Sequence, residues 1–192
     1  MLCSVLIASR KRPDGLHKSI QSLYDTAKPE NFEVLVRLDD DDDKTLDRLS
    51  EFEHYGNVRI LIGPHLNGRE STGTFLNELA RLASGDWIYI TNDDMLMLGS
   101  GWDEQLKAVP KSGYVVHPEF YWLGDTLHGS GSCGVIAPFV PNKCWEQYGL
   151  SEIGGGGSAD DWLTEFLVNT KGWQPWLLKG ITCKHEALPT ET

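Results

Sequence analysis

The sequence has no apolar run long enough to cross a membrane and no surplus of basic residues. No stretch reaches the roughly 18 consecutive apolar residues that a spanning helix needs. Lys and Arg number 17 against 28 Asp and Glu, which gives a net charge of −11. Nucleic acids and anionic membranes are bound by clustered Lys and Arg. The composition therefore argues against both kinds of partner and against a transmembrane segment.

Cysteine and histidine are too scattered to form a recognisable metal or disulfide motif. The six histidines show no zinc-ligand spacing, and no Cys-x-x-Cys pair occurs among Cys3, Cys133, Cys144 and Cys183. We expect Cys3 and Cys183 to be buried free thiols. Basic residues at 10–12 follow the first short apolar run, so we expect no signal peptide and a cytoplasmic protein.

The first half of the chain alternates short apolar runs with amphipathic segments. The apolar runs predict strands at 2–8, 32–38, 58–62 and 87–91. Apolar residues at helical spacing predict helices at 16–27, 46–52 and 74–83. Gly85 is expected to stop the last of these helices. This alternation is typical of an α/β fold with a mostly parallel central sheet flanked by helices.

The second half is less regular. It predicts helices at 102–109, 141–148 and 160–169, and short strands at 114–117, 133–137, 176–179 and 181–184. The run Gly154–Gly157 is interpreted as a loop, because the 35 residues after it are too few for a second core. We therefore expect one domain over residues 1–192.

Polar residues follow three of the predicted parallel strands. These are Ser9-Arg10, the aspartate run that begins at Asp39, and Asn92-Asp93-Asp94. In open α/β sheets, ligands bind outside the carboxyl ends of the strands. The three segments are far apart in the sequence but are expected to share one edge of the sheet, which predicts a binding site there.

Two of these segments suggest specific ligands. Asp39 directly follows its strand, where a carboxylate accepts hydrogen bonds from the base or ribose of a nucleotide. Asp41 to Asp43 are interpreted as a solvated loop. The oxygens of Asn92, Asp93 and Asp94 suit Mg²⁺ or Mn²⁺. The alternative for the second segment is a turn or helix cap, in which Asn and Asp are also favoured.

Three further groups carry two interpretations each. Asp160 and Asp161 open a predicted helix, so they are either N-terminal caps or a general base for an attacking hydroxyl. His185 near the chain end is either structural or a metal ligand. Arg10, Lys11, Arg12 and Arg69 are either plain surface charge or counter-charges for a diphosphate.

At this point the sequence resembles a family-2-type glycosyltransferase with the GT-A fold. The likeness rests on the stretch from Ser4 to Pro13, on Glu33 to Asp40, and on Asn77 followed by Ala83-Ser84-Gly85-Asp86 and the strand that leads into Asn92-Asp93-Asp94. It covers the first ~100 residues, and element boundaries are blurred in such comparisons.

The resemblance implies a nucleotide-sugar-binding half at 1–98 and an acceptor-binding half at 99–192. A UDP- or GDP-sugar is implied as donor, with contacts from Ala8, Ser9, Arg10, Asp39, Arg69 and Asp93. Mn²⁺ or Mg²⁺ is implied as cofactor, with Asp94, Asn92 and His185 as ligands. Asp161, with Asp160 as the alternative, is implied as the base that activates a glycan or other hydroxyl acceptor in an inverting transfer.

The sequence departs from the family pattern at two places. Asn92 stands where an aspartate is usual, so Asp94 is paired with either Asp93 or Asn92 as metal ligands. Phe75-Leu76 stands where Ala-Arg is frequent, so a phosphate-facing arginine is either absent or replaced by Arg69. Two other functions stay open from the residues: a nucleotidyltransferase, and a non-catalytic nucleotide-sugar or glycan-binding domain.

Overall fold

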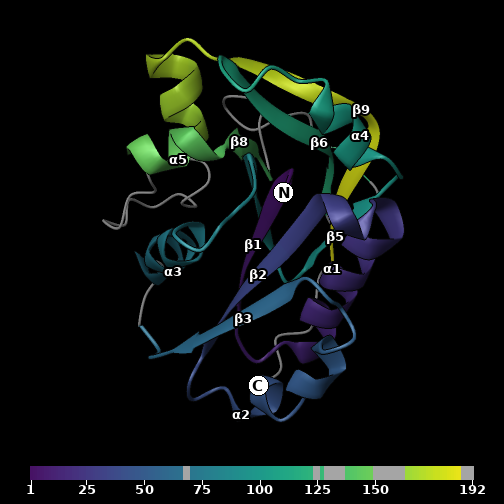
Figure 1. Ribbon diagram of the computed structural model, residues 1–192, viewed down its shortest axis with the longest axis vertical. Helices are drawn as coiled ribbons and strands as arrows, with labels where there is room; N and C mark the ends of the chain where they lie inside the picture. Colours follow the sequence, from purple (N-terminus) through teal and green to yellow (C-terminus); the bar gives the residue numbers. More distant parts are fainter. Residues whose placement is uncertain (67–69, 123–125, 128–136, 149–162, 187–192) are drawn as a thin grey trace.

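One mixed β-sheet runs through the protein and carries helices on its faces (Figure 1). The structure is a computed structural model that describes residues 1–66, 70–122, 126–127, 137–148 and 163–186. The nine described strands are β1 (Cys3–Ser9), β2 (Phe32–Asp39), β3 (Val58–Gly63), β4 (Trp87–Asn92), β5 (Met95–Leu98), β6 (Tyr114–Trp122), β7 (Thr126–Leu127), β8 (Phe139–Pro141) and β9 (Gln174–His185). They lie in the order β3-β2-β1-β4-β8-β6-β9-β5, with β7 paired to β6.

The described helices connect or flank these strands. The α-helices are α1 (Pro13–Thr26), α2 (Asp43–Leu46), α3 (Glu70–Ala80), α4 (Trp102–Lys107) and α5 (Asn142–Tyr148). Short turns of other helix types are η1 (Pro29–Asn31), η2 (Leu49–Phe52) and the π-helical η3 (Phe166–Thr170). The helix predicted at 46–52 is divided between α2, which begins at Asp43, and η2. The part of 160–169 that the structure describes is helical from Leu163.

The predicted parallel arrangement is confirmed for the first half of the chain. β3, β2, β1 and β4 are neighbours, and all three pairings are parallel. Every residue of β2 is buried, and in β1 only Ala8 is partly exposed. Strands covered on both faces need apolar side chains on both faces, which explains why these runs are continuous rather than alternating.

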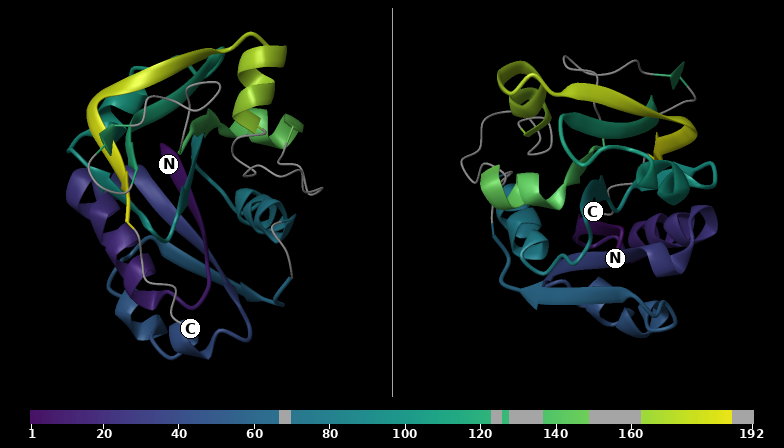
Figure 2. Two further views of the ribbon diagram at one scale, coloured as in Figure 1. Left: turned by 180° about the vertical axis from the view of Figure 1, so that it is seen from behind. Right: turned by 45° about the horizontal axis from the view of Figure 1, so that its top comes forward.

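Two layers of helix cover opposite faces of these strands. Val5 and Ile7 share a buried cluster with Leu16 of α1. Leu6 lies between them in sequence and packs in a second cluster with Leu76 of α3. Successive side chains of a strand point to opposite faces, and Figures 1 and 2 show α1 and α3 on opposite sides of β1 and β2. Each fully buried Leu or Ile contributes roughly 1.5–3 kcal/mol of hydrophobic stabilisation.

The second half makes the sheet mixed, which the sequence did not predict. β8 runs antiparallel to β4, β6 runs parallel to β9, and β5 runs antiparallel to β9. Neither β5 nor β8 was predicted, because four-residue and three-residue strands leave too little pattern. The predicted strand 133–137 falls outside the described residues except for Ala137, which lies in a bend.

β9 is one long strand where two short ones were predicted. It pairs with β6 from Gln174 to Leu177 and again from Thr182, and the register shifts between these stretches. Gly180 lies in the interruption with φ +69, a left-handed conformation that glycine adopts without a steric cost. The predicted break at this glycine is therefore a bulge inside one strand (yellow in Figure 2).

Gly85 does not end α3, contrary to the prediction. The helix spans Glu70–Ala80, and turn bonds from Leu82 to Leu79 and from Ala83 to Ala80 close its last residues. Gly85 instead lies directly against β1: a Cβ there would be 2.5 Å from the backbone nitrogen of Ser4. The glycine is needed because two stretches of backbone meet at this point.

The prediction of buried thiols is confirmed for Cys3 and Cys183, and Cys144 is also buried and free. Burial raises the pKa of Cys183 to about 12 and that of Cys144 to about 11, so neither is a reactive thiolate at neutral pH. In the described part of the chain, every helix is too short or too polar to span a membrane.

Candidate active site

The three polar segments singled out in the sequence meet at one edge of the sheet. β1 lies between β2 and β4, with Ser9 opposite Leu38 and Ala8 opposite both Arg37 and Asn92. The carboxyl ends of the three strands are therefore level with one another. The predicted shared edge is confirmed, and Ala8, with its small and partly exposed side chain, lies in its middle.

Asp93, after β4, is held by side chains that follow β1. It is buried, and its Oδ2 accepts a hydrogen bond of 2.7 Å from Ser9 Oγ. Arg12 Nη1 donates to Asp93 Oδ1 at 3.2 Å and to Asp94 Oδ2 at 3.0 Å. Burial raises the pKa of Asp93, and the contacts from Ser9 and Arg12 oppose this rise. The Arg12 guanidinium therefore bridges the two neighbouring carboxylates.

His185 joins this group from the other end of the chain. β9 pairs with β5 so that His185 is opposite Met95, and the Glu186 N–H donates to the backbone oxygen of Asp94 at 2.8 Å. This pairing brings His185 Nε2 to 3.4 Å from Asp94 Oδ2. The structure therefore places two of the three predicted metal ligands, Asp94 and His185, side by side.

Asn92, the third predicted ligand, differs from its neighbours. Its side chain is exposed, whereas Asp93 is buried and Asp94 is largely buried. Its backbone oxygen accepts a hydrogen bond of 3.1 Å from Ser19 Oγ on α1. Asp93 shares Arg12 Nη1 with Asp94, and His185 Nε2 lies 3.4 Å from Asp94 Oδ2, so a cation held by Asp94 is better served by Asp93 and His185 than by Asn92.

The donor set at Asp94 fits a divalent metal ion. Carboxylate oxygens with one imidazole nitrogen are ligands that Mn²⁺ accepts. Asp94 Oδ1 is buried and has no hydrogen-bond partner among the described residues. A buried carboxylate oxygen left without a donor is costly, and a bound cation removes that cost.

A second acidic cluster lies at the end of β2. Asp39 is buried, and its Oδ2 accepts from Arg10 Nη1 at 2.6 Å and lies 2.8 Å from His65 Nδ1. Arg10 also binds Asp41 through both terminal guanidinium nitrogens, Nη1 and Nη2. The hydrogen bonds from Arg10 lower the pKa of Asp41 to about 2 and raise the pKa of Arg10. Arg10 thus links the ends of β1 and β2.

This second cluster is also a set of possible metal ligands. Ligand atoms of Asp39, Asp41 and His65 all lie within 4.8 Å of one another. Arg10 already neutralises both carboxylates, however, and the His65 ring lies against Asp39. Sequence reasoning missed His65; its only signal is that it follows Gly63, the carboxyl end of β3.

Arg37 is a buried arginine that the sequence did not single out. Its guanidinium contacts Glu78 of α3, the backbone oxygens of Leu38 and Pro64, and Asp39 Oδ1 at 3.5 Å. Arg37 therefore helps to fix the position of Asp39 from inside the fold. The predicted residues Arg69, Asp160 and Asp161 lie outside the described residues, so their roles stay predictions.

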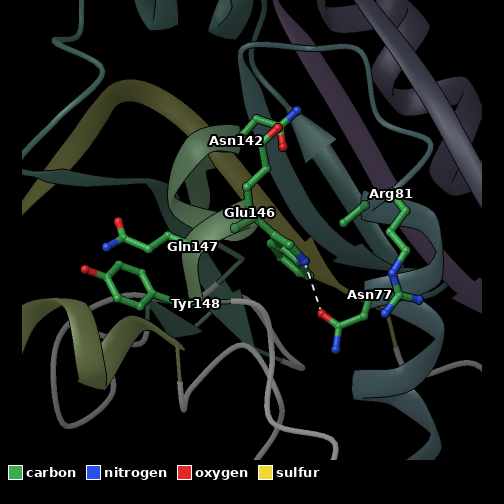
Figure 3. Close-up of a pocket in the computed structure, with 8 residues that line it drawn as sticks. Asn77, Arg81, Asn142, Glu146, Gln147 and Tyr148 are labelled. Carbon is green, nitrogen blue, oxygen red and sulfur yellow. Dashed lines mark hydrogen bonds between the residues drawn. The ribbon is translucent and has the colours of Figure 1, made fainter.

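A cavity of 350 Å³ lies between α3 and α5 (Figure 3). Asn77 on one wall accepts a hydrogen bond of 3.1 Å from the indole nitrogen of Trp145, which is buried. Asn142 on the other wall is bonded to the backbone oxygen of Asp86, just before β4 begins. This wall lies at the opposite end of β4 from Asp93, so the cavity is separate from the acidic edge.

A match to a known protein family identifies this fold. Residues 4–128, more than half of the chain, match the family described as Glycosyl transferase family 2. The chain belongs to glycosyl transferase family 2. The fold is accordingly that of GT-A glycosyltransferases, with a mixed central sheet flanked by helices, and the match includes β1, β2 and β4 with all their carboxyl-end acids.

Solved structures share this fold. S. aureus TarS 1–349 in complex with UDP-GlcNAc has a TM-score of 0.75 and 12% identity, covering 98% of this chain and 60% of that one. The mannosyltransferase PcManGT from Pyrobaculum calidifontis in complex with GDP-Man and Mn²⁺ has a TM-score of 0.69 and 16% identity, covering 98% and 57%. The chain thus spans about 60% of the length of these proteins. A search of curated proteins gives no match.

Proposed function

We propose that this family-2 domain transfers a sugar from a UDP- or GDP-sugar to the hydroxyl of a glycan or another acceptor, with the help of Mn²⁺ or Mg²⁺. The observation that carries the proposal is the level register of β2, β1 and β4, which brings Asp39 and Asp94 to either side of the Ser9–Arg12 turn. One end of this edge suits a nucleoside and the other suits a cation and a diphosphate.

The proposed donor-binding half is residues 1–98. Asp39 accepts hydrogen bonds from the base or ribose, and Arg10 and Arg69 with Ala8 and Ser9 line the path to the diphosphate. Asp94 and His185 hold the cation with Asp93, and Asn92 is the alternative ligand to Asp93. When bound, the cation neutralises charge on the departing diphosphate. The Mn²⁺ bound by PcManGT supports this choice of metal.

The acceptor side is proposed to be residues 99–192. Asp161, or Asp160 in its place, takes the proton from the acceptor hydroxyl, as the family resemblance implies. A single base and direct displacement give inversion at the anomeric carbon.

The decisive experiment measures binding of UDP and GDP by calorimetry with and without Mn²⁺. We expect one of the two nucleotides to bind much more tightly with Mn²⁺, and Asp94→Asn to weaken that complex by at least roughly tenfold. Asp86→Asn is the matched control: it makes the same charge change at an exposed residue before β4, at the opposite end of the strand.

The alternatives give different outcomes. If Asp41→Asn abolishes the Mn²⁺ effect and Asp94→Asn does not, the cation belongs to the Asp39–Asp41–His65 cluster. Tight, metal-dependent nucleotide binding without hydrolysis or transfer of a bound sugar indicates a non-catalytic binder. Release of pyrophosphate from a nucleoside triphosphate and a sugar phosphate indicates a nucleotidyltransferase.

A further inference from the structure

The backbone of Arg12 is fixed beside the cation ligands. Lys11, before it, has φ +57, a left-handed conformation that is uncommon for a residue with a side chain. The Lys11 N–H donates to Asp42 Oδ2 at 2.7 Å, and Pro13 begins α1 immediately after Arg12. The Arg12 side chain is 35% exposed. The Arg12 side chain, unlike its backbone, is therefore able to move without disturbing the turn.

One nitrogen of Arg12 spans the two carboxylates at the end of β4. Nη1 lies 3.2 Å from Asp93 Oδ1 and 3.0 Å from Asp94 Oδ2. A small divalent cation bound by both carboxylates would need the space that Nη1 and its hydrogens fill between Asp93 Oδ1 and Asp94 Oδ2. The two positive charges would also repel each other at such close range. Arg12 in this position and the cation exclude one another.

We propose that the Arg12 side chain occupies the cation's position between Asp93 and Asp94 in the metal-free protein. When the cation binds, this side chain turns to the diphosphate of the donor. This inference rests on the metal site proposed above. It accounts for how Asp93, a buried carboxylate, is compensated without metal, since an unpaired buried charge is strongly destabilising. A guanidinium that is released next to a diphosphate matches its oxygens in two-point hydrogen bonds.

The exchange makes metal and nucleotide binding depend on each other. Metal alone must displace Arg12 into water, whereas metal with a diphosphate gives Arg12 new partners. Each ligand must therefore increase the affinity for the other, and by the same factor. Removal of the guanidinium has opposite effects on the two steps: it eases entry of the metal and weakens the nucleotide complex.

The test measures Mn²⁺ affinity by calorimetry without nucleotide, and then with saturating UDP or GDP. For Arg12→Gln we expect Mn²⁺ alone to bind roughly tenfold more tightly than to the unmodified protein, the factor that corresponds to one charge-assisted hydrogen bond. The gain in Mn²⁺ affinity on adding nucleotide is expected to shrink by a similar factor. Neither readout requires turnover.

Two control variants separate displacement from a general change of charge. Lys11→Gln removes an exposed neighbouring charge, and Arg59→Gln removes one whose partner, Glu33, lies at the start of β2, at the other end of the sheet. Both are expected to leave Mn²⁺ affinity within about twofold, because exposed charges are screened over about 8–10 Å. The Mn²⁺ affinity of Arg12→Lys is expected to lie between those of Arg12→Gln and Lys11→Gln. Arg12→Lys provides the measurement if Arg12→Gln folds poorly.

The possible failures are distinguishable. Mn²⁺ affinity that is unchanged or weaker in Arg12→Gln, or raised equally in Lys11→Gln, overturns the Arg12 assignment and leaves the metal site standing. Absence of Mn²⁺ binding to the unmodified protein, with and without nucleotide, overturns the metal site and this inference together.

Discussion

Replacement of Arg37 by methionine tests whether the site is supported from within the fold. Only 2% of the Arg37 side chain is exposed, and its guanidinium lies 4.4 Å from the centre of the Phe75 ring. It donates to Pro64 O at 2.9 Å, to Leu38 O and to Glu78 Oε2 at 3.1 Å. Methionine has a similar unbranched shape but makes none of these polar contacts.

The expected cost follows from the partners that are left behind. The buried oxygen of Leu38 loses a donor, and a buried acceptor without a partner costs about 1–3 kcal/mol. Pro64 is exposed, so its oxygen is rehydrated at little cost. Loss of the contact with Phe75 adds about 0.5–2 kcal/mol. Glu78 is one-third exposed and is rehydrated, and Asp39 keeps its ion pair with Arg10. The substitution also removes a buried charge, and this offsets part of the loss. We expect a net loss of roughly 2 kcal/mol.

Urea unfolding followed by tryptophan fluorescence measures this loss. Arg48→Met is the matched control, because Arg48 also makes several ion pairs but its partners Asp14 and Glu51 are exposed, so its loss is expected to cost at most about 1 kcal/mol. If Arg37→Met and Arg48→Met are equally stable, or if Arg37→Met loses less than about 1 kcal/mol, the buried contacts of Arg37 do not support the site as argued.

Two further predictions concern stability. Burial raises the pKa of Asp93 above its unfolded-state value. The contribution of Asp93 to the free energy of unfolding is therefore most favourable below the unfolded-state pKa, and it is lost as the pH rises through the folded-state pKa. Asp93→Asn is therefore expected to raise the melting temperature of the metal-free protein at pH 7 by about 2 °C and to leave it unchanged near pH 3; a lower value at pH 7 contradicts this. Gly85→Ala places a Cβ 2.5–2.9 Å from three backbone atoms of β1 and is expected to cost about 3 kcal/mol in thermal or urea unfolding. Gly56→Ala, where a Cβ meets nothing within 4 Å, is its control and should be near neutral.

Much of the first half of the chain could be predicted because its signals are local. β1, β2 and β4 are mostly apolar runs followed by polar residues, the pattern typical of parallel strands that are buried on both faces. Once those runs are parallel neighbours, their carboxyl ends must share an edge. The meeting of Asp39, Ser9 and Asp93 follows from this register without knowledge of any side-chain contact.

The second half resisted prediction because its strands depend on distant partners. Met95–Leu98 becomes β5 through its pairing with residues 182–185, and Phe139–Pro141 becomes β8 through its pairing with residues 87–89. Strands of three or four residues carry too little periodicity to be recognised alone. Gly85 was misinterpreted for the same reason: its role is set by the backbone of Cys3 and Ser4, which is distant in sequence.

Local sequence patterns specify the α/β order of the first half and the acids at its strand ends, because burial and strand period act on neighbouring residues. Which charges meet depends on the folded backbone. His185 reaches Asp94 through the pairing of β9 with β5, His65 reaches Asp39, and Arg12 lies between Asp93 and Asp94. Ion pairs depend on distances of a few ångströms between residues far apart in the chain, and only the folded backbone sets those distances.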